Sequence, residues 1–448
     1  MGVVVQFGTS TIRARLGGRP RRAGLVAAAG LLAALTALSA CTTGGADAAE
    51  NSASAQNTSA PGTSTPTAPG TATSSSSQQD GASLAVITAA PLGKAVSPVT
   101  PVTVNATDGT LTAVTLRNAD GKKVSGAITA DGTSWKNTEV LGYGKSYSLS
   151  ATAVNSSGTK TVKRASFTTL TPDNMTMPYL NTIYGASLEN GATYGVGMIA
   201  VVNFDEPIPD RAAAERALQV TTTPHVDGAW TWLDDHTAHW RPEKYYAPGT
   251  KVTVNAKVYG VEVGPGLYGQ ADQKVSFQIG AKHVAIADAK THKVRVYFDN
   301  KRVRTMDTSM GQGGWVDGKN GKISLWTMPG TYTVIGHENP ATMSSDSYGL
   351  PANSPYGYAP EKVPYATKIS TDGIYLHELD STVGYQGHQN VSHGCLNLNY
   401  TNAKWYYNTS RVGDVVKVIN SGGPAIKLWQ GGDWSVPWAT WVKGSALH

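Results

Sequence analysis

The stretch Gly-Lys-Ser-Tyr-Ser-Leu at residues 144–149 alternates polar and apolar side chains directly after a turn glycine. About 105 residues later a similar pattern returns as Gly-Thr-Lys-Val-Thr-Val at residues 249–254. An alternation of period two is typical of a β-strand that buries one face. Because the repeat distance matches the length of one small all-β domain, the sequence predicts two such domains in tandem.

The region before the first stretch supports this interpretation. Asp-Gly turn pairs at 108–109 and 120–121 separate short alternating runs, as expected for a sandwich of short strands. We therefore expect two immunoglobulin-like β-sandwiches, at residues 84–171 and 172–280. A short helix is expected from Asp210, its N-cap, to Leu218 in the second. Neither sandwich gathers acids, bases and nucleophiles, so we expect both to space and present the rest of the chain.

Residues 281–420 are expected to form a third, also mainly β domain with long loops and a short helix. Residues 283–288 and 293–298 predict a hairpin, and residues 401–408 predict the helix, with Thr401 or Asn402 as its N-cap. Long Gly/Ser/Pro-rich loops on a strand scaffold are where functional residues usually lie. The remaining segment, residues 421–448, is rich in tryptophan, and we expect it to pack on the third domain.

The first 40 residues have the pattern of an export signal, in which an Arg-rich stretch precedes an apolar run. The run ends in Leu-Ser-Ala-Cys at residues 38–41, which resembles the lipidation box of bacterial lipoproteins. We expect Cys41 to be lipidated, with an uncleaved anchor as the alternative. Residues 41–83 have alanine as their main apolar residue and predict a disordered linker. The protein is therefore expected to be exported and lipid-anchored at the outer face of the cytoplasmic membrane or in the cell wall, by a Sec or twin-arginine route.

The charge balance argues against a nucleic-acid-binding protein. The 448 residues carry a net charge of +6, but five of the 37 basic residues lie within the first 22 positions. The remaining 32 bases face 31 acids, so the body of the protein has no excess of positive charge for a phosphate backbone. With only 2 cysteines, the chain is also no disulfide-rich scaffold.

If Cys41 is lipidated, the second cysteine, Cys395, is a lone thiol in an exported protein. Such a thiol could be a catalytic nucleophile, or it could be a buried, inert side chain. His393 precedes it by two positions, and His377 ends a strand upstream. Either imidazole could activate the thiol. Gly394 frees the backbone, so its N–H and that of Cys395 could bind one oxyanion. These features favour a nucleophile. A zinc site at Cys395, His393 and His377 lacks a further strong ligand, so we expect no metal and no cofactor.

The motif Ser-His-Gly-Cys at residues 392–395, preceded by a strand that ends in His377, resembles the signature of the L,D-transpeptidase catalytic domain. Residues 348–355, 357–358, 386–397 and 402–407 also resemble that domain. From about residue 84 onwards the chain looks most like the type made by high-GC Gram-positive bacteria. In that type, a lipoprotein has two immunoglobulin-like domains before the catalytic domain and a Trp-rich tail after it.

The resemblance implies acyl transfer on peptidoglycan, with donor tetrapeptide stems and an acceptor amine as partners. Cys395 would attack the carbonyl between a diamino acid and the terminal D-alanine, and the resulting thioester would pass to the amine of a second stem in a 3→3 cross-link. His377 matches the family's general base, and His393 and Gly394 match the motif around the nucleophile. Five positions fall where the family contacts substrate or covers the pocket: Tyr358, Asp372, Gly373, Asn397 and Met343.

Two departures from close relatives stand out. Glu378 and Asp380 follow the expected base, and they could either favour a cationic acceptor or only line a solvated loop. Pro265 stands where some relatives have an acidic calcium ligand, so we expect no calcium there. The sequence leaves open an L,D-carboxypeptidase, an enzyme that attaches proteins to the wall through the same cysteine, and a non-catalytic wall-binding lipoprotein.

Overall fold

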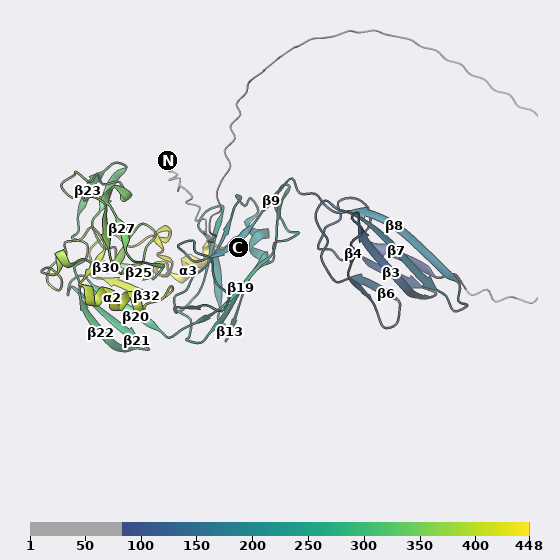
Figure 1. Ribbon diagram of the computed structural model, residues 1–448, viewed down its shortest axis with the longest axis horizontal. Helices are drawn as coiled ribbons and strands as arrows, with labels where there is room; N and C mark the ends of the chain where they lie inside the picture. Colours follow the sequence, from purple (N-terminus) through teal and green to yellow (C-terminus); the bar gives the residue numbers. More distant parts are fainter. Residues whose placement is uncertain (1–82, 448) are drawn as a thin grey trace, which may run out of the picture. The chain divides into compact units, whose positions relative to one another are not determined.

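The computed structural model describes residues 83–447, which are coloured by sequence in Figure 1. The expected signal peptide, Cys41 and nearly all of the expected linker lie outside the described residues. Strands dominate the described part of the chain, as the alternating patterns predict. None of its helices is long and apolar enough to cross a membrane.

The first domain is a sandwich of two four-stranded sheets, with strand orders β1-β2-β6-β5 and β4-β3-β7-β8. The stretch that opens the repeat lies at the start of β7, which pairs antiparallel with β3 and β8. Its inward residues Tyr147 and Leu149 are buried, so the alternation marks a strand with one buried face, as predicted. The strands are β1 (Val86–Ala90), β2 (Thr103–Thr107), β3 (Thr110–Asn118), β4 (Lys123–Val124), β5 (Gly126–Ile128), β6 (Ser134–Asn137), β7 (Ser146–Val154) and β8 (Lys160–Thr168).

The second domain has the sheets β10-β12-β15-β14 and β11-β19-β16-β13, with a small third sheet β17-β18-β9. The second copy of the repeat lies mainly in β16. The predicted helix is confirmed as α1 (Arg211–Ala217), and the Asp210 side chain caps it by accepting from the Ala213 N–H. The strands are β9 (Asn174–Thr176), β10 (Pro178–Asn181), β11 (Thr193–Tyr194), β12 (Ala200–Phe204), β13 (Leu218–Thr223), β14 (Gly228–Trp232), β15 (Thr237–Pro242), β16 (Lys251–Ala256), β17 (Glu262–Gly264), β18 (Leu267–Gly269) and β19 (Gln273–Ile279).

The third domain is built on two sheets, β22-β21-β20-β32-β25 and β26-β29-β30-β31, with two separate hairpins, β23-β24 and β27-β28. The predicted hairpin at its start is confirmed as β20 and β21. The strands are β20 (His283–Asp288), β21 (Lys293–Phe298), β22 (Lys301–Asp307), β23 (Trp315–Gly318), β24 (Gly321–Ser324), β25 (Gly330–Thr333), β26 (Gly336–Glu338), β27 (Ala341–Met343), β28 (Glu361–Val363), β29 (Ala366–Lys368), β30 (Tyr375–Glu378), β31 (Leu396–Leu398) and β32 (Val415–Ile419).

The predicted helix of the third domain is α2 (Tyr400–Thr409), which contacts β29 and β30. Two single-turn 3-10 helices, η1 (Ser345–Tyr348) and η2 (Asp380–Thr382), lie in its loops. The predicted N-caps of α2, Thr401 and Asn402, are wrong. Asn399 is the cap, because its side chain accepts from the Asn402 N–H at 2.9 Å and its own backbone is extended.

Glycines let the second domain touch the third backbone to backbone. Gly195 N–H donates to the Val412 carbonyl and Gly197 N–H donates to the Gly413 carbonyl, both at 2.8 Å. A Cβ atom at Gly195 would collide with the backbone of Gly413 and Asp414. The contact therefore requires glycine.

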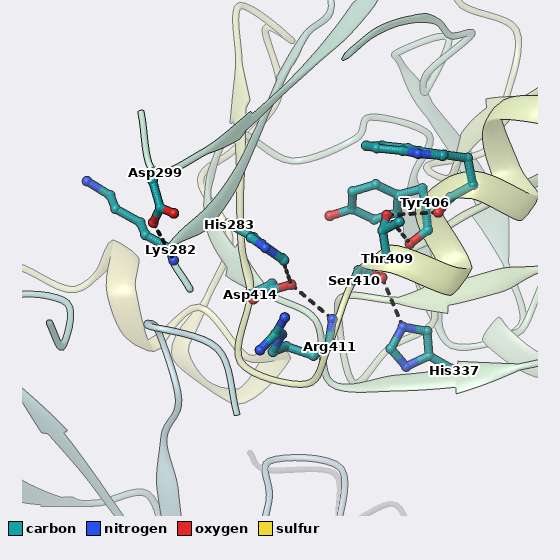
Figure 2. A network of polar contacts seen from close by, with 10 residues as sticks. Lys282, His283, Asp299, His337, Tyr406, Thr409, Ser410, Arg411 and Asp414 are labelled. Carbon is teal, nitrogen blue, oxygen red and sulfur yellow. Dashed lines mark hydrogen bonds and ion pairs between the residues drawn. The ribbon is translucent and has the colours of Figure 1, made fainter. Parts of the chain in front are cut away.

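A buried polar network stands beside this contact (Figure 2). The imidazole of His283, on β20, lies 3.0 Å from the Asp414 carboxylate, which also accepts the Arg411 N–H at 2.9 Å. His337 Nε2 lies 2.9 Å from the Ser410 hydroxyl at the end of α2. Burial raises the pKa of Asp414, and the facing imidazole opposes this effect. The network fixes the turn at residues 411–414 that meets the second domain.

The Trp-rich tail differs from the prediction that it packs on the third domain alone. Its first half contacts that domain, where the Ser435 hydroxyl accepts the Thr331 N–H at 2.7 Å. Its second half lies on the second sandwich, where the Thr231 hydroxyl donates to the carbonyl of fully buried Trp441. The tail consists of η3 (Leu428–Gln430), η4 (Asp433–Ser435), α3 (Trp438–Trp441) and η5 (Val442–Gly444).

Buried charges on the second sandwich explain this docking. The His239 ring lies 2.7 Å from the Asp433 carboxylate, and Arg241 donates to the Val436 carbonyl at 2.7 Å. The buried Glu215 carboxylate accepts from the Ala446 N–H at 2.7 Å and from the Ser445 hydroxyl at 2.5 Å. Buried charges without such partners would be costly, so the sandwich needs the tail.

Candidate active site

A parallel strand pair brings together the residues that the sequence singles out. In the β30–β31 ladder, Leu376 lies opposite Leu396 and His377 lies opposite Asn397. Both leucines are buried in the core of the domain. Because side chains alternate along a strand, His377 and Asn397 lie on the opposite face. Cys395, in the bend directly before β31, packs on the same small apolar cluster as Tyr375, which lies two residues before His377 on β30.

The Cys395 thiol is half-buried and held in place by backbone groups. Its Sγ lies 3.6 Å from the Gly373 carbonyl, to which the thiol donates. Burial raises the pKa of Cys395 to about 11, the Asp372 carboxylate adds to this effect, and the Tyr375 N–H opposes it. The thiol is therefore neutral at pH 7, and attack requires a base that takes its proton.

His377 has the properties of that base. Its ring is buried, and Nδ1 lies 2.8 Å from the Glu378 carbonyl. Because a carbonyl only accepts, Nδ1 carries the proton and Nε2 is left as the acceptor. Burial lowers the pKa of His377 to about 4, partly offset by the hydrogen bond to that carbonyl. The imidazole is neutral over the physiological range.

The loop that carries the thiol is fixed from both sides. The Ser392 hydroxyl donates to the Cys395 carbonyl at 2.6 Å and accepts the Gly394 N–H at 3.1 Å. The Thr327 hydroxyl donates to the Gly394 carbonyl at 2.7 Å. Gly394 has a φ of +141°, a conformation that favours glycine. Of the two expected oxyanion donors, the Gly394 N–H is thus engaged by Ser392, and the Cys395 N–H remains as the candidate.

Two further predicted residues lie around the thiol. Met343, at the end of β27, packs on the same small apolar cluster as Cys395. The Tyr358 ring lies 5.5 Å from the His393 ring, centroid to centroid, and 6.4 Å from the Tyr348 ring. Burial raises the pKa of Tyr358 and lowers the pKa of His393. His393 therefore packs beside the Tyr358 ring, and burial lowers its pKa, which favours the neutral form.

The two expected substrate contacts at 372 and 373 have different surroundings. The Gly373 carbonyl faces the thiol. The Asp372 carboxylate is exposed but already holds two donors, the Ser370 hydroxyl at 2.5 Å and the Gln430 amide at 2.6 Å. Asn397 is buried, and its carbonyl accepts from Thr308 and Ser309. Through its two hydrogen bonds, Asp372 orders the loops around it, a role that the sequence motif did not indicate.

The carboxylates of Glu378 and Asp380 accept hydrogen bonds from backbone N–H groups. Glu378 Oε1 accepts the Asp380 N–H at 2.9 Å, and Asp380 Oδ1 accepts the Tyr400 N–H at 3.4 Å, at the start of α2. The sequence left open whether these two acids favour a cationic acceptor or only line a solvated loop. The contacts favour the second interpretation, in which the acids order the loop.

Cys395, His377 and His393 do not form a metal-binding cluster. Within residues 83–447, only Asp234, Asp235 and His236 come close enough together to hold an ion. They lie on a largely exposed bend of the second sandwich, and exposed acidic groups of this kind are common without an ion.

Several residues that shape the site carry no signal in the sequence. Thr327 and Ser370 fix loops through hydroxyl groups, and Gln430 reaches the site from 58 positions away. Lys368, buried beside Tyr375, has its ammonium 3.8 Å from the centre of the Tyr184 ring of the second sandwich. No local pattern marks these residues, because their partners come from distant parts of the chain.

Comparison with known proteins agrees with this arrangement. A family model described as bacterial Ig domain matches residues 93–262, and one described as L,D-transpeptidase catalytic domain matches residues 282–418. The chain is 41% identical over 347 residues to L,D-transpeptidase 2 of Mycobacterium tuberculosis, covering 77% of this chain and 81% of the relative. It is 36% identical over 363 residues to L,D-transpeptidase 5 of the same species, covering 79% and 74%.

Solved structures of similar sequence include LD transpeptidase LdtMt1 in complex with imipenem. That match has 29% identity, covers 54% of this chain and 99% of the other, and has a TM-score of 0.44. An L,D-transpeptidase from Mycobacterium smegmatis matches at 30% identity over 54% and 99% of the two chains, with a TM-score of 0.41.

Proposed function

The chain belongs to the L,D-transpeptidase family, whose members act on peptidoglycan stem peptides, and we propose that Cys395 is its nucleophile and His377 its general base. One observation carries the proposal. Cys395 packs on the cluster of Tyr375, two residues before His377 on β30, and the Glu378 carbonyl leaves His377 Nε2 free to take a proton. Neither group is charged at pH 7, because the pKa of Cys395 is raised and that of His377 is lowered.

The first half-reaction acylates the enzyme. Sγ attacks the carbonyl between the diamino acid and the terminal D-alanine of a tetrapeptide stem, while the thiol proton moves to His377 Nε2. The negative charge that forms on the carbonyl oxygen is stabilised by the Cys395 N–H. The C–N bond then breaks, and the protonated imidazole returns its proton to the leaving D-alanine. A thioester remains on Cys395.

The second half-reaction transfers the acyl group. The side-chain amine of a second stem attacks the thioester, His377 removes a proton from that amine, and the sulfur leaves with that proton. The product is a 3→3 cross-link and the thiol is restored. Tyr358 and Met343 are proposed to cover the donor stem. Asp372, Gly373 and Asn397 are proposed to line its approach, with His393 and Gly394 shaping the nucleophile loop.

The position in the cell is a second part of the proposal. The Leu-Ser-Ala-Cys motif at residues 38–41 supports lipidation of Cys41, and the polar linker to residue 83 supports a tether. The enzyme would then work at the outer face of the cytoplasmic membrane, where stem peptides are found.

The test uses the purified protein and tetrapeptide muropeptides, with products identified by mass. We expect D-alanine release together with a dimer joined by a 3→3 bond. D-alanine release without a dimer would instead identify an L,D-carboxypeptidase. Unchanged muropeptides with no labelling of Cys395 would identify a non-catalytic wall-binding protein.

A further inference from the structure

The hydrogen-bond acceptor of the resting Cys395 thiol, the Gly373 carbonyl, lies on a tight turn at residues 370–373. The Ser370 hydroxyl donates to Asp372 Oδ1 at 2.5 Å and accepts the Ile374 N–H at 2.8 Å. Gly373 has a φ of +103° and follows directly, with its carbonyl 3.6 Å from Sγ. The position of this carbonyl depends on how firmly the Asp372 side chain is held.

Gln430, in the Trp-rich tail, holds the Asp372 side chain. Its side chain is buried, its Nε2 donates to Asp372 Oδ2 at 2.6 Å, and its Oε1 accepts the Lys427 N–H at 2.9 Å. The Gln430 carbonyl accepts the Thr371 N–H at 3.1 Å, and the Trp429 carbonyl accepts the Thr371 hydroxyl at 2.8 Å. Hydrogen bonds to a charged carboxylate are stronger than those between neutral groups.

The tail itself is immobilised three residues further on. Asp433 is fully buried against His239 of the second sandwich. Arg241 Cζ lies between 4.5 and 5.3 Å from the ring centres of three tryptophans: Trp434, Trp438 and Trp441. A planar cation packed among aromatic rings gives a rigid contact. Gln430 therefore lies in a segment that is fixed against the second sandwich.

We propose that Gln430 is a positioning residue of the active site: by fixing the Asp372 carboxylate, it holds the Gly373 carbonyl in place against the Cys395 thiol. The inference rests on the proposed role of Cys395 as nucleophile. It assigns the tail, and through it the second sandwich, a part in the orientation of the reacting sulfur.

The test reverses the donor and acceptor of the Asp372–Gln430 hydrogen bond. In Gln430→Glu, the side chain keeps its shape and its acceptor for Lys427, but a carboxylate oxygen faces Asp372. In Asp372→Asn, the new amide at position 372 faces the amide of Gln430, so the carboxylate acceptor is lost. In the double variant, the new amide at position 372 donates to the new carboxylate at position 430, so the bond and the net charge are restored. The readout is the second-order rate of Cys395 acylation by imipenem, followed by mass on the full chain.

We expect Gln430→Glu and Asp372→Asn each to slow acylation by about tenfold or more. The double variant should recover to within about threefold of the wild-type rate. Ser435→Ala is the matched control: it removes the hydroxyl contacts of the same tail with Thr331, away from the turn, and should acylate at the wild-type rate. If Gln430→Glu does not fold, Gln430→Met, which is uncharged and of similar length, takes its place and should also slow acylation.

Wild-type rates in the Gln430 variants, or a double variant as slow as the product of its two single variants, would overturn the positioning role. Cys395→Ala, assayed for D-alanine release from muropeptides, separates this failure from that of the proposed function. Release that persists in Cys395→Ala overturns the nucleophile, whereas its loss alongside unaffected Gln430 variants overturns only the positioning role.

Discussion

The backbone carbonyl of Glu378 accepts the Nδ1 proton of His377, the residue directly before it, at 2.8 Å. In this arrangement the orientation of the proposed base depends on main-chain geometry and not on a carboxylate partner. The ring is buried, so bulk solvent does not compete for this proton. The side chain of Glu378 and the imidazole of His377 can therefore be tested separately.

His377→Ala should slow acylation by a carbapenem on the order of a hundredfold or more, because the neutral thiol loses its proton acceptor. Glu378→Ala is the matched control and should stay within a few-fold of the wild type, since its carbonyl remains. His393→Ala should act mainly by disturbing the loop. A wild-type pH profile of acylation in His377→Ala, together with a lost profile in His393→Ala, would show that the two roles are reversed.

Cys395→Ala should fold normally and lose labelling both by iodoacetamide and by imipenem. Because burial raises the pKa of the thiol to about 11, wild-type Cys395 should alkylate at pH 8 roughly a hundredfold more slowly than a free thiol of pKa about 8.5. Mass spectrometry after timed alkylation gives the rate. Alkylation as fast as that of free cysteine would show a preformed thiolate instead.

His377 should also make the stability depend on pH. Its pKa is lowered to about 4 in the folded protein, so between about pH 6.5 and 4 the unfolded chain binds more protons than the folded one. The stabilisation from the neutral ring is present above pH 6.5 and is lost as the pH falls towards 4. Chemical unfolding across this range should show a smaller slope in His377→Gln than in the wild type. Equal slopes would show that the ring is not buried in its neutral form.

Trp441→Ala should destabilise the protein by about 3–5 kcal/mol, because this side chain is fully buried between the tail and the second sandwich. Trp429→Ala is the control from the same segment. The residue is 59% exposed, so the expected change lies within about 0.5 kcal/mol. Urea unfolding monitored by circular dichroism measures both, and similar losses in the two variants would contradict the docking of the tail.

Cys41→Ala should lose the acyl mass and move the protein from the membrane fraction to the soluble fraction. One acyl chain alone binds a membrane only marginally, so stable anchoring requires a lipid group with more than one chain. Fractionation and intact mass of the two forms test this. A free thiol at Cys41 in membrane-bound protein would point to the uncleaved anchor.

Patterns of short range were the ones that could be predicted from sequence. The alternation at 144–149 and 249–254 determines which side chains are buried, and Asp210 caps the helix that begins directly after it. The cysteine loop was found because its motif is contiguous. Local ambiguity explains the misplaced cap of α2: Asn399, Thr401 and Asn402 are all good caps, and only the backbone conformation selects among them.

Contacts between distant segments could not be predicted. Nothing in the sequence near Gln430 indicates Asp372, and the tryptophans of the tail carry no sign that their cation, Arg241, lies in the second sandwich. The engagement of the Gly394 N–H by Ser392 was equally hidden, because it depends on a rotamer of a hydroxyl group. Such contacts are properties of the tertiary fold.

The carboxylate of Glu215 has a consequence for the order of events during biosynthesis. Two of its three hydrogen-bond donors, Ser445 and Ala446, lie 230 and 231 positions downstream. While these residues are still inside the ribosome, this buried charge has only the Trp232 indole as a partner, and the sandwich lacks its cover. The second domain, although translated before the catalytic one, reaches its final form only after residues 445 and 446 have left the ribosome. A nascent protein stalled or cut short before residue 445 would expose the same unfinished surface to proteases.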